Sequence, residues 1–174
     1  METSHSKTVA LRSAESAANY AARVQEELKS AWLPYIYRER VRKTRTRAYS
    51  FEKFKAKERI DIQHTLLGVE LKIGQRRLLC PDLATARYLS VFARAGCEQA
   101  AVPYDITKIS QLADELESSW HRMLLLVDHL AFHKSEAFRN RIKKLLLAAI
   151  RAEIAEAGAG TPVPEFKQST KQRS

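Results

Sequence analysis

The segment from Gly68 to Asp105 constrains the fold more than any other part of the chain, because three local patterns follow one another in it. Residues 69–73 alternate apolar and polar side chains, which is the pattern of a half-buried strand. Gly74-Gln75 has the composition of a two-residue turn whose first position needs a positive φ. Residues 76–80 return as the partner strand. We therefore predict a β-hairpin over about residues 66–80.

A helix with defined ends and a short strand follow the hairpin. Asp82 stands at an N-cap position, and apolar residues recur at helical spacing from Leu83 to Ala95. Gly96 stands where a left-handed residue ends a helix. The apolar residues before Pro103 then predict a short strand over about residues 99–103.

Apolar residues also recur at helical spacing in three further segments. The first runs from a cap at Ser13 to Leu33, and Pro34 should kink or end it. The second runs over about residues 107–132. The third begins at the cap Ser135 and ends near Gly158, which makes the last two an antiparallel helical hairpin.

These elements predict an α+β fold that is mostly helical, with three or four amphipathic helices packed with one small sheet. That sheet is expected to contain the hairpin and the strand near Val102. We expect a disordered lead over residues 1–12, a single globular domain over 13–160 and a disordered tail over 161–174.

Composition narrows the classes of function. The chain has 174 residues, a net charge of +10 and a pI near 9.8, which favours an anionic partner. No apolar run approaches the roughly 20 residues of a membrane helix, and no signal peptide is visible, so we expect a cytoplasmic protein without a membrane partner. Cys80 and Cys97 lack metal or redox spacing and should be buried. Without a phosphate-cradling glycine motif, we expect no cofactor.

A basic segment over residues 38–59 is the leading functional feature. We interpret it as a partly ordered connector that is helical toward its first end. Its cations could neutralise phosphates of DNA or RNA, and two of its aromatic rings are candidate partners for base stacking. The function that this predicts is non-enzymatic nucleic-acid binding with weak sequence preference, within a larger assembly. The candidate residues are Arg38, Arg40, Arg42, Lys43, Arg45, Arg47, Tyr49, Phe51, Lys53, Lys55 and Lys57.

An interaction module is the principal alternative. In that interpretation the same basic segment docks on an acidic protein surface, and the chain is a helical adaptor or assembly factor. The amphipathic helix over residues 13–33 would leave an apolar seam free for a partner or for a second copy of the chain.

A third interpretation comes from Asp61 followed by Val69-Glu70-Leu71-Lys72 on a strand, then a helix and the strand near Val102. Over about residues 60–104 this order resembles the PD-(D/E)xK nucleases. The resemblance implies that Asp61 and Glu70 bind a divalent metal and that Lys72 assists the attacking water. The structural alternative is that Glu70 and Lys72 form the solvent-exposed face of an edge hairpin.

Overall fold

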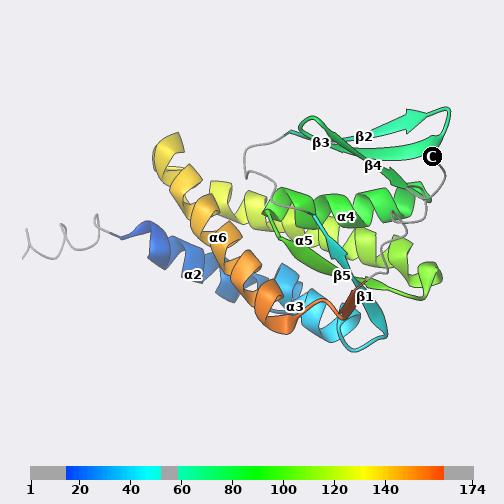
Figure 1. The fold of residues 1–174 in the computed structure, drawn as a ribbon. Coiled ribbons are helices and arrows are strands. Elements are labelled where there is room, and N and C mark those ends of the chain that lie inside the picture. Colours follow the sequence, from blue (N-terminus) through cyan, green and yellow to red (C-terminus); the bar gives the residue numbers. More distant parts are fainter. Residues whose placement is uncertain (1–14, 52–58, 163–174) are drawn as a thin grey trace, which may run out of the picture.

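The computed structural model describes residues 15–51 and 59–162, and it shows a mostly helical α+β fold, as predicted (Figure 1). The residues 1–14, 52–58 and 163–174 lie outside the described part, and most of the predicted lead and tail falls there. The α-helices are α2 (Ala17–Leu28), α3 (Leu33–Ile36), α4 (Leu83–Ala95), α5 (Ile109–Leu130) and α6 (Glu136–Ala157). None of the helices in the described ranges is long and apolar enough to cross a membrane.

The strands form two sheets in the described part of the chain. The strands are β1 (Thr46–Ser50), β2 (Ile60–Thr65), β3 (Gly68–Ile73), β4 (Arg76–Cys80), β5 (Gln99–Pro103) and β6 (Thr161–Pro162). One sheet has the order β2-β3-β4, with both pairs antiparallel. The other has the order β5-β1-β6, in which β1 is antiparallel to β5 and parallel to β6. The predicted hairpin and short strand are thus confirmed, but the prediction that they share one sheet is wrong.

The partner of β5 is β1, which lies inside the segment that we interpreted as a connector. Residues 46–50 alternate in exposure, with Thr46 and Ala48 buried and Arg47 half-buried. The sequence hid this strand because its inward residues are small and its outward residues are charged. The interpretation of a connector is therefore wrong for residues 46–50. The predicted helicity at its first end is confirmed, because Tyr37–Val41 form a π-helical turn after α3.

Helix α2 belongs to the core. Its inward residues Tyr20, Val24 and Leu28 are buried, and the helix packs against α5 and α6. The prediction of a free apolar seam on this helix is therefore wrong. A 3₁₀ turn at Lys29–Ala31 and the short α3 follow, so the predicted break near Pro34 is confirmed.

Helix α4 connects the two parts of the fold. The Asp82 side chain accepts a hydrogen bond from the Thr85 backbone N–H at 2.7 Å, and Gly96 ends the helix with a φ of 77°, as predicted. One face of α4 packs on the β2-β3-β4 sheet and another packs on α5. Tyr88 and Phe92 are fully buried, and they contact the Ala101 carbonyl of β5 and the Tyr37 ring, respectively.

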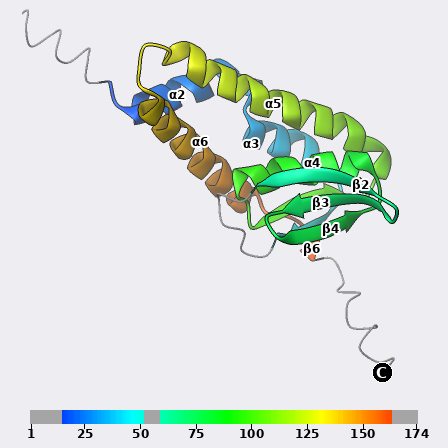
Figure 2. The ribbon, with the colours of Figure 1, turned by 90° about the horizontal axis from the view of Figure 1, so that it is seen from above.

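Helices α5 and α6 are joined by residues 131–135, where the Ser135 side chain caps α6. Figure 2 shows that α5 and α6 diverge from this connection, so the predicted helical hairpin opens into a V. Helix α2 contacts both arms of the V. The helices therefore form one body, and the β2-β3-β4 sheet lies on its α4 side (Figures 1 and 2).

Candidate functional site

The first half of the basic segment is engaged in contacts with the helical body. Arg38 pairs with Glu153 at 3.1 Å, and Arg40 pairs with Glu115 at 2.9 Å. Arg42 donates to the Ala157 carbonyl at 2.9 Å and to Thr46 Oγ1 at 2.7 Å. Lys43 pairs with Glu39 one helical turn away. Arg38, Arg40 and Arg42 therefore hold the π-helical turn and the residue after it against α6, α5 and β1, while the Lys43 pair is local to the turn.

The second half of the segment is only partly described. The Arg45 guanidinium lies over the Tyr104 ring, 4.8 Å from its centroid, and Arg47 is half-buried on β1. Lys53, Lys55 and Lys57 lie outside the described residues.

The two candidate stacking residues occupy different environments. Phe51 is only 1% exposed, and its backbone N–H donates to the Glu98 carbonyl at 2.9 Å. A base cannot reach this ring, so the assignment of Phe51 as a stacking residue is wrong. Its phenyl ring lies in the core because Phe51 directly follows strand β1 and its backbone is still bonded to Glu98, the residue before β5. Tyr49 is half-buried and meets Phe51 edge-on, with ring centroids 5.1 Å apart.

A second candidate site lies on the face of the β2-β3-β4 sheet opposite α4. No described element covers this face (Figure 1). The register places Asp61 opposite Lys72 and Lys72 opposite Arg77 in one row across the three strands. The next row contains Gln63, Glu70 and Leu79. We call these six residues the open sheet face. Because side chains alternate along each strand, Asp61, Glu70 and Lys72 share it as near neighbours.

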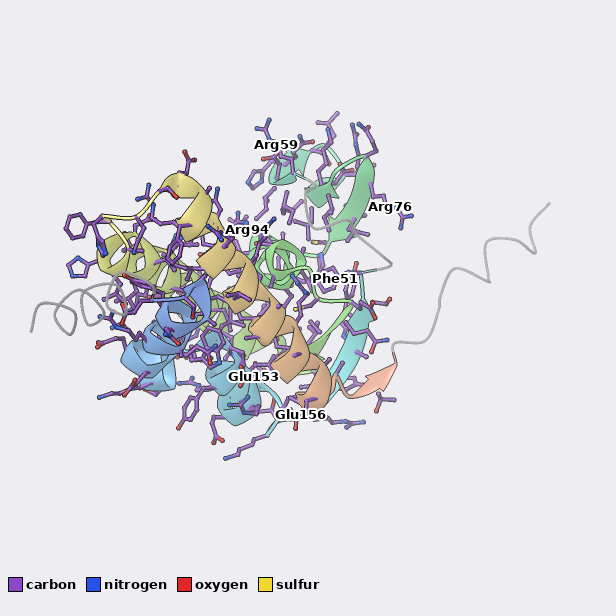
Figure 3. The ribbon with its side chains drawn as sticks, turned by 90° about the vertical axis from the view of Figure 1, so that its left-hand side faces the viewer. Phe51, Arg59, Arg76, Arg94, Glu153 and Glu156 are labelled. Atoms are coloured by element: carbon purple, nitrogen blue, oxygen red, sulfur yellow. The ribbon has the colours of Figure 1, made fainter. Side chains whose placement is uncertain are left out.

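Charge on the open sheet face is unevenly paired. Asp61 pairs with Arg59 at 3.0 Å, while Lys72 has no carboxylate partner among the described residues. The Glu70 Oε2 atom is buried without a hydrogen-bond partner and lies 4.0 Å from the Arg77 guanidinium. Figure 3 shows Arg59 and Arg76 at this sheet, apart from helix α6, which carries Glu153 and Glu156. The open sheet face therefore brings Lys72 and Arg77, with Arg59 beside β2, close to two carboxylates, whereas Arg76 is paired with Ile73 and belongs to the other face.

This arrangement fits part of what the nuclease resemblance implies. Asp61 and Glu70 supply two hard oxygen ligands on one face, and the unpartnered Glu70 oxygen is the kind of atom that a divalent cation would satisfy. Residues 15–51 and 59–162 contain no group of three or more His, Cys, Asp or Glu side chains placed to hold a metal. The strand expected after the helix, β5, belongs to the other sheet.

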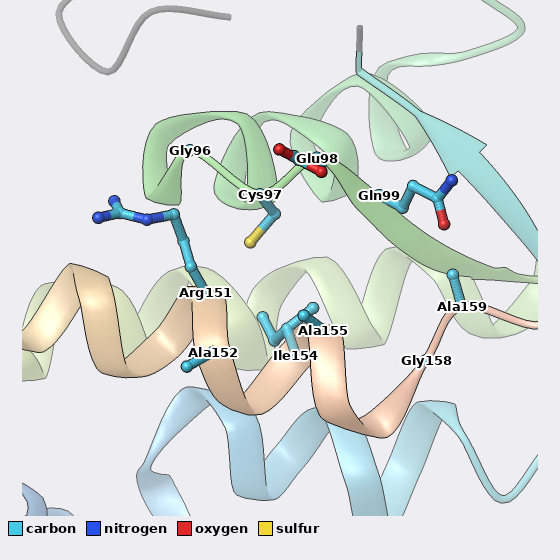
Figure 4. Close-up of a pocket in the computed structure, with 10 residues that line it drawn as sticks. All are labelled: Gly96, Cys97, Glu98, Gln99, Arg151, Ala152, Ile154, Ala155, Gly158 and Ala159. Carbon is cyan, nitrogen blue, oxygen red and sulfur yellow. The ribbon is translucent and has the colours of Figure 1, made fainter. Parts of the chain in front are cut away.

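A cavity that the sequence did not predict lies between the loop after α4 and the last turns of α6 (Figure 4). Its volume is about 580 Å³. The Arg151 guanidinium at its edge donates to the Ala95 carbonyl at 3.1 Å. Burial raises the pKa of the Cys97 thiol to about 12, so this cysteine stays protonated and unreactive at neutral pH. Cys80 is also buried with a free thiol, and both cysteines behave as predicted.

Sequence reasoning missed Arg77 as a candidate binding residue. Its signal was the turn at Gly74-Gln75, since a two-residue turn fixes Lys72 opposite Arg77. No protein-family model, curated protein or solved structure matches this chain.

Proposed function

We propose that this protein binds the phosphate backbone of nucleic acid through the open sheet face. The observation that carries the proposal is the row of Lys72 and Arg77 on an uncovered sheet face, with Arg59 next to it in an ion pair with Asp61. The proposal moves the contact surface away from residues 38–43, whose cations already have partners within the chain.

Two features of the sheet support backbone contacts. Lys72 forms no ion pair with a carboxylate among the described residues, so binding a phosphate breaks no existing ion pair of this side chain. The sheet also holds its cations on rigid strands, which lowers the entropy lost on binding. Lys and Arg contacts to phosphates carry little sequence information, so the sequence preference should be weak.

Fluorescence anisotropy with short single-stranded and duplex oligonucleotides tests the proposal, in EDTA and across a salt series. The wild-type affinity should fall linearly on a log–log salt plot, with a slope of about −0.9 per phosphate contact on duplex DNA. The variant Lys72→Ala/Arg77→Ala should show a slope that is shallower by about 2. A matched control is Lys108→Ala/Lys144→Ala, which removes two exposed cations from other elements and should leave the slope unchanged.

An acidic protein is the rival ligand for the same cations. Polyglutamate competitor and an oligonucleotide of equal charge separate the two. Stronger binding of polyglutamate at matched salt, or no binding of either oligonucleotide at low salt, would overturn the proposal.

Metal-dependent nuclease activity is a second candidate function, favoured by the unpartnered Glu70 oxygen beside Asp61. In this alternative Asp61 and Glu70 would hold a divalent cation. Such a cation supplies Lewis-acid stabilisation of the phosphate and lowers the pKa of bound water. The Lys72 ammonium would neutralise the same phosphate from the neighbouring position on the strand.

Calorimetric titration with Mn²⁺ tests the metal site without relying on activity. The wild type should bind Mn²⁺, and Asp61→Asn and Glu70→Gln should each weaken that binding. Incubation of plasmid DNA with Mg²⁺ or Mn²⁺ tests the reaction, with EDTA as the control. Absence of both Mn²⁺ binding and cleavage would remove this candidate.

A further inference from the structure

The turn between β2 and β3 carries two leucines in full contact with solvent. Leu66 is 108% exposed and Leu67 is 81% exposed. The turn is nevertheless ordered, because Thr65 Oγ1 accepts from the Leu67 N–H at 3.3 Å and donates to the Gly68 carbonyl at 3.2 Å. The fold therefore holds these two side chains outward instead of burying them.

A third exposed leucine lies behind them on the open sheet face, opposite Glu70. Leu79 on β4 is 64% exposed. A Cβ atom built on Gly68 would lie 3.7 Å from Leu79 Cδ1, and Gly68 has a φ of 129°, which L-residues rarely adopt. The positive φ favours glycine at this position, and Leu79 Cδ1 lies at an ordinary van der Waals distance from it. Leu66 and Leu67 form an apolar tip at the β2-β3 end of the sheet, which we call the leucine tip, and Leu79 lies behind it in the row of Glu70.

We propose, building on the proposed nucleic-acid binding, that the leucine tip inserts between base pairs of duplex DNA from the minor groove while Lys72 and Arg77 contact the phosphates. Apolar side chains used as wedges partly unstack a base step and kink the duplex. The chemistry recognised is therefore a deformable base step flanked by phosphate backbone.

The spacing along β3 suits this arrangement. Lys72 lies four positions after Gly68 on β3, which corresponds to about 13 Å along a strand. The minor groove is about 7.5 Å deep, so a tip that extends about 13 Å beyond the cations reaches the groove floor. The row of Lys72 and Arg77 would then remain at the level of the backbone.

The same spacing disfavours a membrane surface. Interfacial anchors place Lys and Arg around the inserted apolar residues, so that the cations contact lipid headgroups as the apolar side chains enter. Here Gln63 and Glu70 lie between the leucine tip and the Lys72 row. A polyanion with a groove between its phosphates fits this offset better than a flat anionic surface.

The test uses the full-length chain and a DNA duplex with 2-aminopurine at its centre, whose emission rises on unstacking. The wild type should raise the emission about twofold or more at saturation. The variant Leu66→Ser/Leu67→Ser should bind about tenfold more weakly, with an unchanged salt slope and no rise in emission. Leu125→Ser, which changes an exposed leucine on α5, should behave as the wild type.

Each contrary outcome has a distinct meaning. If the tip variant binds and unstacks DNA like the wild type, the wedge is overturned while the phosphate contacts stand. If the wild type binds no oligonucleotide at low salt, the proposed function itself fails. If the wild type, but not the tip variant, sediments with vesicles of neutral and anionic phospholipid, the tip is a membrane anchor and the proposal is overturned. The single variant Leu66→Ala serves as a second test, because it removes one solvent-exposed side chain that makes no core contact.

Discussion

The cations of residues 38–43 and those of the β2-β3-β4 sheet differ in what they already contact. Arg38 and Arg40 reach across to carboxylates on α6 and α5, and Arg42 bonds to the end of α6. Lys72 has no such partner among the described residues, and Arg77 lies at the limit of an ion pair with Glu70. The richer run of arginines therefore already has acceptors within the fold, whereas Lys72 on the sheet has no ion pair to leave when it meets the phosphate that we propose as its ligand.

The comparison shows that a segment rich in cations is not necessarily the surface whose cations can reach a ligand. A run of arginines gains little binding capacity if each guanidinium already has an acceptor. A cation on an uncovered sheet can meet phosphate without first leaving a partner. The following predictions test this division, beginning with the largest effect.

Tyr37→Phe should lower the free energy of unfolding by about 2–4 kcal/mol, because it removes a buried hydroxyl that makes two hydrogen bonds. The Tyr37 hydroxyl donates to the Gly158 carbonyl at 2.5 Å and accepts from the Ala101 N–H at 3.0 Å. Urea denaturation followed by circular dichroism measures the loss. Tyr35→Phe, in the preceding helix α3 and exposed, is the control and should stay within about 0.5 kcal/mol of wild type.

Glu70→Gln should leave stability unchanged or raise it by about 0.5–2 kcal/mol in EDTA, since the variant removes a charge whose buried oxygen has no hydrogen-bond partner. Unchanged or raised stability is expected if Glu70 serves binding rather than stability. Urea denaturation measures it beside Glu26→Gln, which changes an exposed carboxylate on α2. A clear loss of stability would show that Glu70 serves the fold.

Arg38→Ala and Arg40→Ala should each destabilise by only about 0.2–1 kcal/mol, because both ion pairs are partly exposed and screened by solvent. Their losses should add, since the pairs involve different helices. Chemical denaturation at low and high salt measures the effect, which should shrink as salt is added. A loss that is insensitive to salt would assign the arginines a packing role instead.

The free energy of unfolding should change little with pH near neutrality and should fall above about pH 9. Burial raises the pKa of Cys97 to about 12, and burial also raises the pKa of Tyr37 and Tyr88. The folded state then holds these protons more tightly than the unfolded state, so stability falls as pH rises from about 9. Urea midpoints from pH 7 to 10 measure the trend, and Cys97→Ala should reduce its steepness.

Local sequence patterns were sufficient to predict the helices whose ends carry a capping residue. Asp82, Gly96 and Ser135 cap helices as predicted, because capping depends on residues next to one another in sequence. The pairing of β5 with β1 could not be predicted in the same way, since about 50 residues separate the strands and Arg45 and Arg47 mask the small inward residues. Which strands pair depends on which side chains must be buried together in the folded protein.

The features of the candidate site also divide into those set by neighbouring residues and those set by the packing of distant segments. The shared face of Glu70 and Lys72 was predictable from strand alternation, and Asp61 joins them through the register of β2. The partners of Arg38 and Arg40 were not predictable, because Glu153 and Glu115 lie 115 and 75 residues further along the chain. Only the packing of α5 and α6 brings those carboxylates to the arginines.

The most direct measurement is the salt dependence of duplex-DNA binding for two matched double variants, Arg38→Ala/Arg40→Ala and Lys72→Ala/Arg77→Ala. Each removes two positive charges, so a difference between them reports position rather than net charge. The account predicts a slope unchanged from wild type for the first variant and one shallower by about 2 for the second. A shallower slope for Arg38→Ala/Arg40→Ala with an unchanged slope for Lys72→Ala/Arg77→Ala would contradict it.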